Sequence, residues 1–285
     1  MTRRYPLLVS LAALATLALG CSGGSENSTS GDGPAEAVDL EAAERSVFSQ
    51  YGEDGVVERI FEIIEPTSRY VVEFGASDGI DASNARNLVM NHGWGGYMIE
   101  GSPKLAKKLK EAYAPYPSVK TERHWVFPGN IEILFEEAGV PKDLDYLVID
   151  IDSNDYYVWR AIHDFRPKVV MLEASMFFPP PQLMVVDFHP MNYWDYTEYH
   201  GASLQSFYNL AKKKGYELVY CMSFGPNCFF VDKQYFDRFG IEDNSPEKIF
   251  KMWQVAPKEG VKIPPDKRFL KVNSFRIPKK YIDTR

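Results

Sequence analysis

The chain has 285 residues, of which 45% are hydrophobic and 14% aromatic, and it carries a net charge of −7 with a pI near 5.4. This is enough apolar sequence for one large core, within the size range of a single α/β domain. Lysine and arginine are scattered along the chain, and the absence of a basic stretch excludes nucleic acid as the main partner.

The first 21 residues have the pattern of a bacterial lipoprotein signal peptide. Two arginines precede an apolar run from Leu7 to Leu19 that is too short to span a bilayer, and Gly20 then precedes Cys21. We expect cleavage before Cys21 and acylation of its thiol, which would anchor the protein to a membrane of the cell envelope. The alternatives are an ordinary signal peptide with a free cysteine, or a misassigned start codon and a cytoplasmic protein.

Residues 22–44 are small, polar and acidic, with too few large apolar side chains to form a core. This composition predicts a flexible linker. The folded domain is therefore expected to span residues 45–285. Within it, Cys221 and Cys228 flank a turn-rich stretch, and the sequence leaves open whether they form a disulfide or remain two small reduced core residues.

From residue 53 onward, segments of helical periodicity alternate with short apolar runs. Glycine and proline mark most of the boundaries between them. In chain order we expect a helix at 53–65, a strand at 69–75, a helix at 82–93 with Ser83 as its N-cap, a strand at 95–100, a helix at 103–114, a strand at 118–127, a helix at 130–139, a strand at 144–152, a helix at 156–165, a strand at 168–174, a helix at 202–215, and a hairpin of strands at 216–222 and 227–232.

This alternation predicts βαβ units and therefore a doubly wound α/β fold, with a mostly parallel seven-stranded sheet and helices on both faces. A C-terminal antiparallel hairpin on such a Rossmann-like sheet is typical of class I methyltransferases. Open α/β sheets bind ligands beyond the carboxyl ends of their strands, where the strand order reverses. The residues that end the strands are therefore the candidate site residues.

The turn after the first strand contains Gly75 and Gly79, which allow backbone amides to approach a ligand closely. Glu73 would accept from N–H groups of this loop or from a ligand ammonium, but it would repel a pyrophosphate. The spacing of the glycines also differs from the G-x-G-x-x-G of dinucleotide-binding folds. Glu100 ends the second strand, where such folds place an acid for the ribose hydroxyls. These features favour S-adenosylmethionine over NAD; the alternative is a tight turn with a solvated Glu100.

A second group of acids consists of Asp150 and Asp152 at the end of one strand, Asp155 in the turn that follows, and Glu173 at the end of the next strand. Carboxylates at neighbouring strand ends repel one another unless they are neutralised. A divalent cation, a protonated substrate or a shared proton would do so, and Asp152 and Glu173 are the candidate metal ligands. The alternative, in which these acids cap helices, explains Asp155 better than Asp150.

His189 and His200 lie in an aromatic-rich segment, "DFHPMNYWDYTEYHGASL", that we expect to cover the strand ends. Either is a candidate general base for deprotonating an acceptor hydroxyl. The candidate catalytic residues are therefore Asp150, Asp152 and His189.

From Ser49 to Phe236 the chain resembles the FkbM-type methyltransferases. The resemblance rests on the segments "SQYGEDGVVERIF", "YVVEFGASDGIDASNARNL", "GWGGYMIEGSP", "LVIDIDSNDYYVWRAI", "PKVVMLEA", "GASLQSFYNLAKKKGYELV" and "NCFFVD". It implies a class I, S-adenosylmethionine-dependent enzyme that methylates an oxygen of a small-molecule or carbohydrate acceptor.

The resemblance also implies roles for individual residues. The turn that holds the methionine end of the cofactor would consist of Glu73, Gly75, Asp78 and Gly79. Glu100 would bind the ribose, and Asp150 and Asp152 would form the motif after the fourth strand.

The signal peptide and the cofactor point to different compartments, because S-adenosylmethionine is made in the cytosol and does not cross bilayers unaided. The main alternative is therefore an envelope lipoprotein whose methyltransferase-like domain binds a glycan or nucleoside without catalysis. A metal-dependent hydrolase is disfavoured, because the histidines show no metal-binding spacing.

Overall fold

The computed structural model describes residues 37–190, 192, 194, 197–251 and 269–271. The chain divides into two compact units, Met1–Pro34 and Ala35–Arg285, and the fold described below belongs to the second. The expected signal peptide, the expected lipid-anchored Cys21 and most of the expected linker lie outside the described residues.

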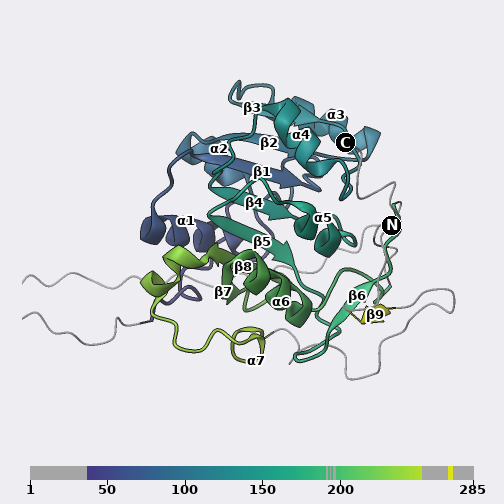
Figure 1. The fold of residues 1–285 in the computed structure, drawn as a ribbon. Coiled ribbons are helices and arrows are strands. Elements are labelled where there is room, and N and C mark those ends of the chain that lie inside the picture. Colours follow the sequence, from purple (N-terminus) through teal and green to yellow (C-terminus); the bar gives the residue numbers. More distant parts are fainter. Residues whose placement is uncertain (1–36, 191, 193, 195–196, 252–268, 272–285) are drawn as a thin grey trace, which may run out of the picture. The chain divides into compact units, whose positions relative to one another are not determined.

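Seven strands form one sheet in the order β3-β2-β1-β4-β5-β8-β7 (Figure 1). Strands β1 to β5 pair in parallel, whereas β8 is antiparallel to both of its neighbours. This order and the antiparallel hairpin are those of the Rossmann-like class I methyltransferase fold, so the predicted fold class is confirmed. The strands are β1 (Tyr70–Phe74), β2 (Gly95–Ile99), β3 (Val119–Glu122), β4 (Tyr146–Ile149), β5 (Val169–Glu173), β7 (Tyr216–Cys221) and β8 (Asn227–Asp232).

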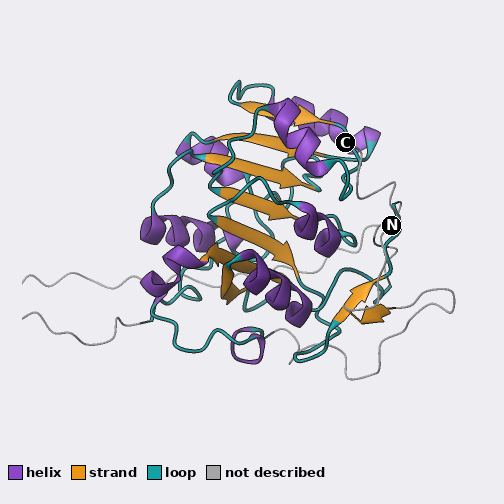
Figure 2. Cartoon of the chain, in the orientation of Figure 1, coloured by secondary structure: helices purple, strands orange, loops and turns teal. Residues whose placement is uncertain are grey.

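Helices cover both faces of the sheet (Figure 2). Side chains alternate between the faces of a strand, so Val71 packs with one group of helices and Val72 with the other. Helices α1 to α3 share the core that contains Val71, and α4 to α6 share the core that contains Val72. The helices are α1 (Glu53–Ile64), α2 (Arg86–His92), α3 (Pro103–Tyr113), α4 (Ile131–Ala138), α5 (Asp155–Ala161) and α6 (Leu204–Lys214).

Helix α2 begins later than its sequence predicts. Its N-cap is Ala85, and the prediction of Ser83 at this position is wrong. The hydroxyl of Ser83 donates to the buried carboxylate of Glu73, and the backbone N–H of Asn84 does the same. These hydrogen bonds hold residues 83–84 in a loop, so the first helical turn forms only beyond them.

Several elements were not expected from sequence. Strand β6 (Met184–Val186) lies in the proline-rich and aromatic stretch and pairs with β9 (Phe269–Lys271) in a separate two-stranded sheet. A 3₁₀ helix, η1 (Lys233–Phe239), and a short α7 (Pro246–Ile249) follow the hairpin. Short strands that pair across such a sequence distance leave little local signal.

The folded part of the chain begins before Arg45. Leu40 is buried, and the N–H of Val38 donates to the carbonyl of Phe239. The carboxylate of Glu44 accepts from Tyr220 in β7 and from Ser223 in the hairpin turn. The expected boundary at residue 45 is therefore too late, because the last residues of the expected linker pack against the domain.

Cys221 and Cys228 are register partners at the turn end of the β7–β8 hairpin, and a disulfide joins them. Both residues are buried. Of the two states that the sequence left open, the structure contains the oxidised one.

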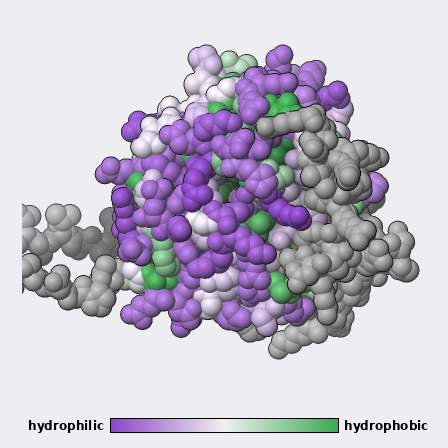
Figure 3. Space-filling view, in the orientation of Figure 1, coloured by the Kyte–Doolittle hydropathy of each residue, from purple (hydrophilic) through white to green (hydrophobic). Residues whose placement is uncertain are grey.

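The face of the domain shown in Figure 3 is mostly hydrophilic, with isolated hydrophobic residues. The large exposed apolar side chains of the described residues are spread over the sequence, and the most exposed of them is Phe224 at 70%. Among the described helices, none combines the length and the apolar character that crossing a membrane requires.

Candidate functional site

A cavity of about 350 Å³ lies beyond the carboxyl ends of β1, β2 and β4. Strand order reverses here, since β2 and β4 lie on opposite sides of β1. This is where an open α/β sheet is expected to bind its ligand. The described residues that line the cavity are Gly75, Ser77, Ile99, Glu100, Gly101, Ser102, Leu105, His124, Trp125, Val126, Asp150, Ile151, Asp152, Asn154, Pro190 and Asn192.

The charge of this cavity is negative. Glu100, Asp150 and Asp152 contribute carboxylates to its wall, whereas none of its described lining residues is lysine or arginine. Carboxylates near a ligand favour positive charge and disfavour phosphate. The cavity is therefore suited to a cationic ligand that also has an apolar part, because Leu105, Trp125 and Val126 belong to the same lining.

Glu100 is held in a fixed orientation at the end of β2. Its Oε2 accepts from the N–H of Ser77 at 3.0 Å, and its Oε1 accepts from the N–H of Ser102 at 2.6 Å. Burial raises the pKa of Glu100, and these two hydrogen bonds oppose that rise. Each carboxylate oxygen retains a second lone pair, so Glu100 can still accept from ligand hydroxyls.

Gly75 is required by the neighbouring strand. It has a φ of +84°, and a Cβ there would lie 1.5 Å from the carbonyl oxygen of Asp150 at the end of β4. The backbones at the ends of β1 and β4 are therefore so close that only glycine fits at position 75. This contact brings the glycine turn and the aspartates to the same cavity.

Gly79 and Asp78 do not line the cavity. A Cβ on Gly79 would lie 2.7 Å from side-chain atoms of Leu109 and Tyr113 in α3, so this glycine serves helix packing. Asp78 closes the turn, because its Oδ1 accepts from the N–H groups of the two residues Ile80 and Asp81. In the structure, Gly79 therefore allows α3 to pack against the loop, and Asp78 stabilises the turn of the loop.

Glu73 also lies away from the cavity lining. It is 3% exposed and shares the face of β1 that carries Val71, beneath α1 and α2. Its carboxylate accepts from the Ser83 hydroxyl at 2.9 Å and from the Asn84 N–H at 2.8 Å. Burial raises its pKa to about 7, and these hydrogen bonds limit the rise. Of the predicted cofactor-binding residues, the structure therefore brings Gly75 and Glu100 to the cavity.

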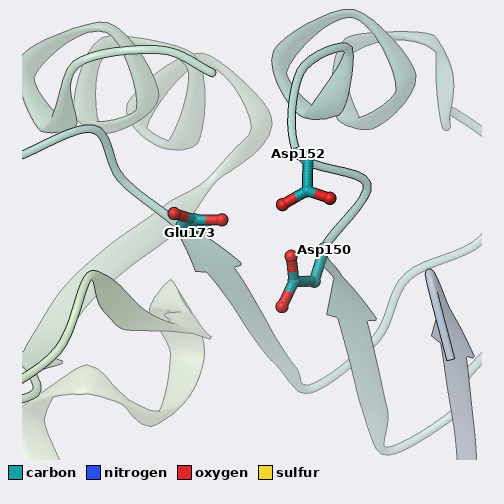
Figure 4. A group of neighbouring side chains, drawn as sticks. All are labelled: Asp150, Asp152 and Glu173. Carbon is teal, nitrogen blue, oxygen red and sulfur yellow. The ribbon is translucent and has the colours of Figure 1, made fainter. Parts of the chain in front are cut away.

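The second group of acids converges at the ends of β4 and β5. Asp150, Asp152 and Glu173 each place a carboxylate oxygen within 4.8 Å of the others, and Figure 4 shows the three side chains pointing toward one another. The register explains part of this, because Ile149 pairs with Leu172 and the next residue of each strand is an acid. Burial raises the pKa values of Asp150 and Glu173, and the charge of Asp152 raises each of them further.

Asp155 is not the N-cap of α5, which begins at this residue after Asn154. Its Oδ1 accepts from the N–H of Ile151 at 2.8 Å, and it therefore stabilises the loop that carries Asp152. Burial raises its pKa to about 7, against the effect of that hydrogen bond. Asp152 itself has a φ of +61°, a conformation that aspartate and asparagine tolerate better than most residues.

The structure places His200, rather than His189, beside the acids. The Nδ1 of His200 lies 3.8 Å from a carboxylate oxygen of Glu173, and the residue is 8% exposed. His189 is exposed and does not line the cavity; its carbonyl accepts from the side chain of Asn154 at 2.9 Å. The prediction of His189 as the catalytic histidine is therefore not supported by its position.

Sequence reasoning missed Asn154 and Ser175. The Asn154 Oδ1 and the Ser175 Oγ are buried and have no hydrogen-bond partner among the described residues. It also missed Tyr51, whose pKa is raised by burial and by the charge of Glu173. An asparagine before a helix is an ordinary N-cap candidate, so its sequence position alone does not indicate that it lines the cavity.

A larger cavity, of about 600 Å³, lies between α5 and α6. None of the predicted site residues lines it. Its cationic residues are mostly exposed, and one of them, Arg166, already forms an ion pair with Asp232 at 2.5 Å. The strand-end cavity is therefore the better candidate site.

No family model matches the chain, and no curated protein matches it. Among solved structures, it is similar to the CMeT domain of the citrinin polyketide synthase, with a TM-score of 0.41 and 11% identity over 63% of this chain. It is also similar to an S-adenosylmethionine-dependent methyltransferase from Clostridium acetobutylicum (TM-score 0.40, 9% identity, 64% of this chain and 91% of that one). A third is the N-terminal domain of EvdMO1 with SAH and D-fucose (TM-score 0.39, 12% identity, 63% of this chain and 80% of that one).

The chain spans 51% of the first of these structures. At such identities the likeness concerns the fold alone. The function of this protein must therefore be inferred from the residues of its own site.

Proposed function

We propose that the chain is an S-adenosylmethionine-dependent methyltransferase of the FkbM type that methylates an oxygen of a small-molecule or carbohydrate acceptor. The observation that carries this proposal is the acidic cavity at the strand ends, whose described lining includes Glu100, Asp150 and Asp152 and no lysine or arginine. S-adenosylmethionine has a sulfonium, an ammonium and no phosphate. A dinucleotide would instead place a pyrophosphate against carboxylates.

The residues of the cavity fit the parts of this cofactor. Glu100 ends β2, the usual place for an acid that accepts from ribose hydroxyls, and its hydrogen bonds to the loop keep it oriented. Gly101 follows it, and a Cβ there would lie 2.9 Å from the ring of Trp125. Glycine at this position lets Trp125 pack against the backbone, where it contributes apolar surface with Leu105 and Val126 for an adenine.

The chemistry requires orientation more than covalent participation. S-adenosylmethionine, when bound, supplies an electrophilic methyl group on a positively charged sulfur. In our proposal the strand-end residues align an acceptor oxygen with that group, and the Asp152 carboxylate takes the hydroxyl proton. Asp152 is suited to this task because it is the most exposed member of the acid cluster.

The second candidate function is a non-catalytic module, in which an envelope lipoprotein binds a glycan or nucleoside. The N-terminal "LALGC" favours it, since an acylated Cys21 would place the domain away from the cytosolic cofactor. The half-buried Glu100, which two backbone N–H groups hold in place, favours the enzyme. We accordingly keep lipid anchoring and envelope localisation as proposals, with a cytoplasmic protein as the alternative.

Calorimetric titration of S-adenosylmethionine into the protein tests the cofactor. We expect micromolar binding, weakened at least tenfold in Glu100→Gln, which corresponds to about 1.4 kcal/mol. Glu111→Gln, an exposed position on α3, is the matched control and should bind like the unaltered protein. No detectable heat in any of the three, with the fold intact by circular dichroism, would contradict the methyltransferase and favour the binding module.

A further inference from the structure

The acid cluster at the ends of β4 and β5 consists of the half-buried Asp150 and Glu173 and the exposed Asp152 (Figure 4). In the described part of the chain, no group donates a hydrogen bond to the carboxylate of Asp150 or Asp152. The Nδ1 of His200 lies 3.8 Å from a carboxylate oxygen of Glu173. Because the three acids lie within 4.8 Å of one another, any two of them that are ionised together repel each other.

A second, independent observation is the unpartnered Oδ1 of Asn154. The residue is 3% exposed and lines the same cavity as Asp150 and Asp152. Its Nδ2 donates to the carbonyl of His189, which fixes the amide, while its Oδ1 is buried without a partner. A buried oxygen in this state is destabilising unless something binds it.

Ser175, just after β5, has a second unpartnered buried oxygen. It follows Glu173 by two positions and is fully buried, and its Oγ has no partner. The atoms of Asn154 and Ser175 that lack a hydrogen-bond partner are thus both oxygens. Hard divalent cations prefer carboxylate, amide and hydroxyl oxygens, whereas zinc prefers nitrogen and sulfur.

We propose that Asp150, Asp152 and Glu173 bind a divalent cation of the Mg²⁺, Mn²⁺ or Ca²⁺ class, with the Oδ1 of Asn154 beside them as a further ligand. Oxygen ligands on opposite sides of one such ion lie about 4 to 5 Å apart. The three carboxylate oxygens lie within 4.8 Å of one another, so they are close enough to bind the same ion. The cation would offset two of the three carboxylate charges and would also provide a partner for the Oδ1 of Asn154.

The role of the cation rests on the proposed function. A six-coordinate ion held by three carboxylates and Asn154 would keep about two positions open. Asp150, Asp152 and Asn154 line the cavity, so an acceptor bound there would be able to reach them. An acceptor with two neighbouring oxygens, such as a diol, would fill both. Binding to the cation lowers the pKa of the acceptor hydroxyl. Asp152 is then a ligand rather than the base, and the hydroxyl proton leaves to water.

Mn²⁺ titration of the full-length, metal-stripped protein, followed by electron paramagnetic resonance and without S-adenosylmethionine, tests the site. We expect one Mn²⁺ per chain, displaced by Mg²⁺ or Ca²⁺, and at least tenfold weaker binding in Asp152→Asn. Asparagine tolerates the φ of +61° at this position, so the variant keeps the loop conformation. Asp143→Asn removes the same charge at the opposite end of β4 and should bind Mn²⁺ like the unaltered protein.

Thermal unfolding shows whether Asp152 binds the cation or only stabilises the fold. Mn²⁺ should raise the Tm of the unaltered protein and of Asp143→Asn but not that of Asp152→Asn. Without metal, Asp152→Asn should be at least as stable as the unaltered protein, because it relieves repulsion in the cluster. The proposal is overturned if the unaltered protein binds no Mn²⁺, or if all three proteins bind it equally.

Failure of the cation site can be distinguished from failure of the proposed methyltransferase function. S-adenosylmethionine binding is measured on the metal-free protein, where Glu100 and the glycine turn are intact. Mn²⁺ binding without S-adenosylmethionine binding would keep the cation site and contradict the methyltransferase. The converse result would keep the methyltransferase and overturn the cation site.

Discussion

Glu73 is a carboxyl group buried at the end of β1, and its protonation is linked to the free energy of unfolding. Burial raises its pKa in the folded protein from 4.5 to about 7. Between these two values the folded state keeps the proton while the unfolded state releases it. The contribution of Glu73 to stability is therefore fully present below about pH 4.5 and is lost as the pH rises toward about pH 7.

Replacing Glu73 with glutamine should remove this dependence. The loss in the unaltered protein is at most about 3 kcal/mol, from a shift of this size. Glutamine keeps one acceptor for the Asn84 N–H, and the Ser83 hydroxyl can turn to accept from the new amide. Urea unfolding from about pH 4.5 to about pH 8 measures the effect.

The exposed Glu111→Gln is the control, and its stability should fall with pH as in the unaltered protein. Identical pH profiles for all three proteins would show that Glu73 is not protonated in the folded state near neutral pH.

The residue scale also shows which site predictions sequence could support. Glu100 and Gly75 were placed correctly at the cavity, because the end of a strand and the turn after it are local features. Glu73 was assigned to the ligand, although it shares a strand face with Val71 and therefore packs beneath helices. Because side chains alternate between the two faces of a strand, Glu73 must share the face of Val71. The sequence does not show that helices cover this face.

At the scale of elements, the position of the site depends on how closely β1 approaches β4. The N–H of Asp150 donates to the carbonyl of Phe74, and Gly75 follows directly with no room for a Cβ. The alternation of strands and helices was readable from periodicity and from turn residues. The order of the strands in the sheet was not, because strand pairing is non-local.

Gly75→Ala should be far more destabilising than Gly139→Ala. Both glycines have positive φ, +84° and +73°, so both substitutions cost about 1 to 2 kcal/mol in backbone strain. At Gly139 an added Cβ meets nothing within 4 Å, whereas at Gly75 it would overlap the carbonyl oxygen of Asp150. We expect Gly75→Ala to lose several kcal/mol more, or not to fold. Equal losses in chemical denaturation would contradict the close approach of β1 and β4.

At the scale of the whole domain, residues 38–44 join elements that are far apart in sequence. Glu44 accepts from the Tyr220 hydroxyl at 2.6 Å, from the Ser223 N–H at 2.7 Å and from the Ser223 hydroxyl at 2.6 Å. Composition alone predicted a linker here, since the segment is small, polar and acidic. Its order comes from contacts with the hairpin and η1, which its own residues do not specify.

We expect Glu44→Ala to lower the free energy of unfolding by about 1 to 3 kcal/mol, because it leaves three donors without their carboxylate. Glu41→Ala is the control: its side chain is 52% exposed and pairs with Lys251 at the surface, so the loss should be below about 1 kcal/mol. Equal stability of the two variants would show that residues 38–44 behave as the flexible linker that composition predicts.

The sequence by itself determined the alternation of helices and strands, the parallel sheet with its antiparallel hairpin, and the strand ends as the place of the site. These follow from periodicity, turn residues and chain connectivity, which are encoded within a few neighbouring residues. Only the tertiary structure decided which strand-end side chains meet. It placed Glu73 in the core and brought Asp150, Asp152 and Glu173 within 4.8 Å of one another. It also left the Oδ1 of Asn154 without a partner in the cavity that Asp150 and Asp152 line. Which side chains lie close together depends on the order of the strands and on the face to which each side chain points. Both are set by packing across the whole sheet.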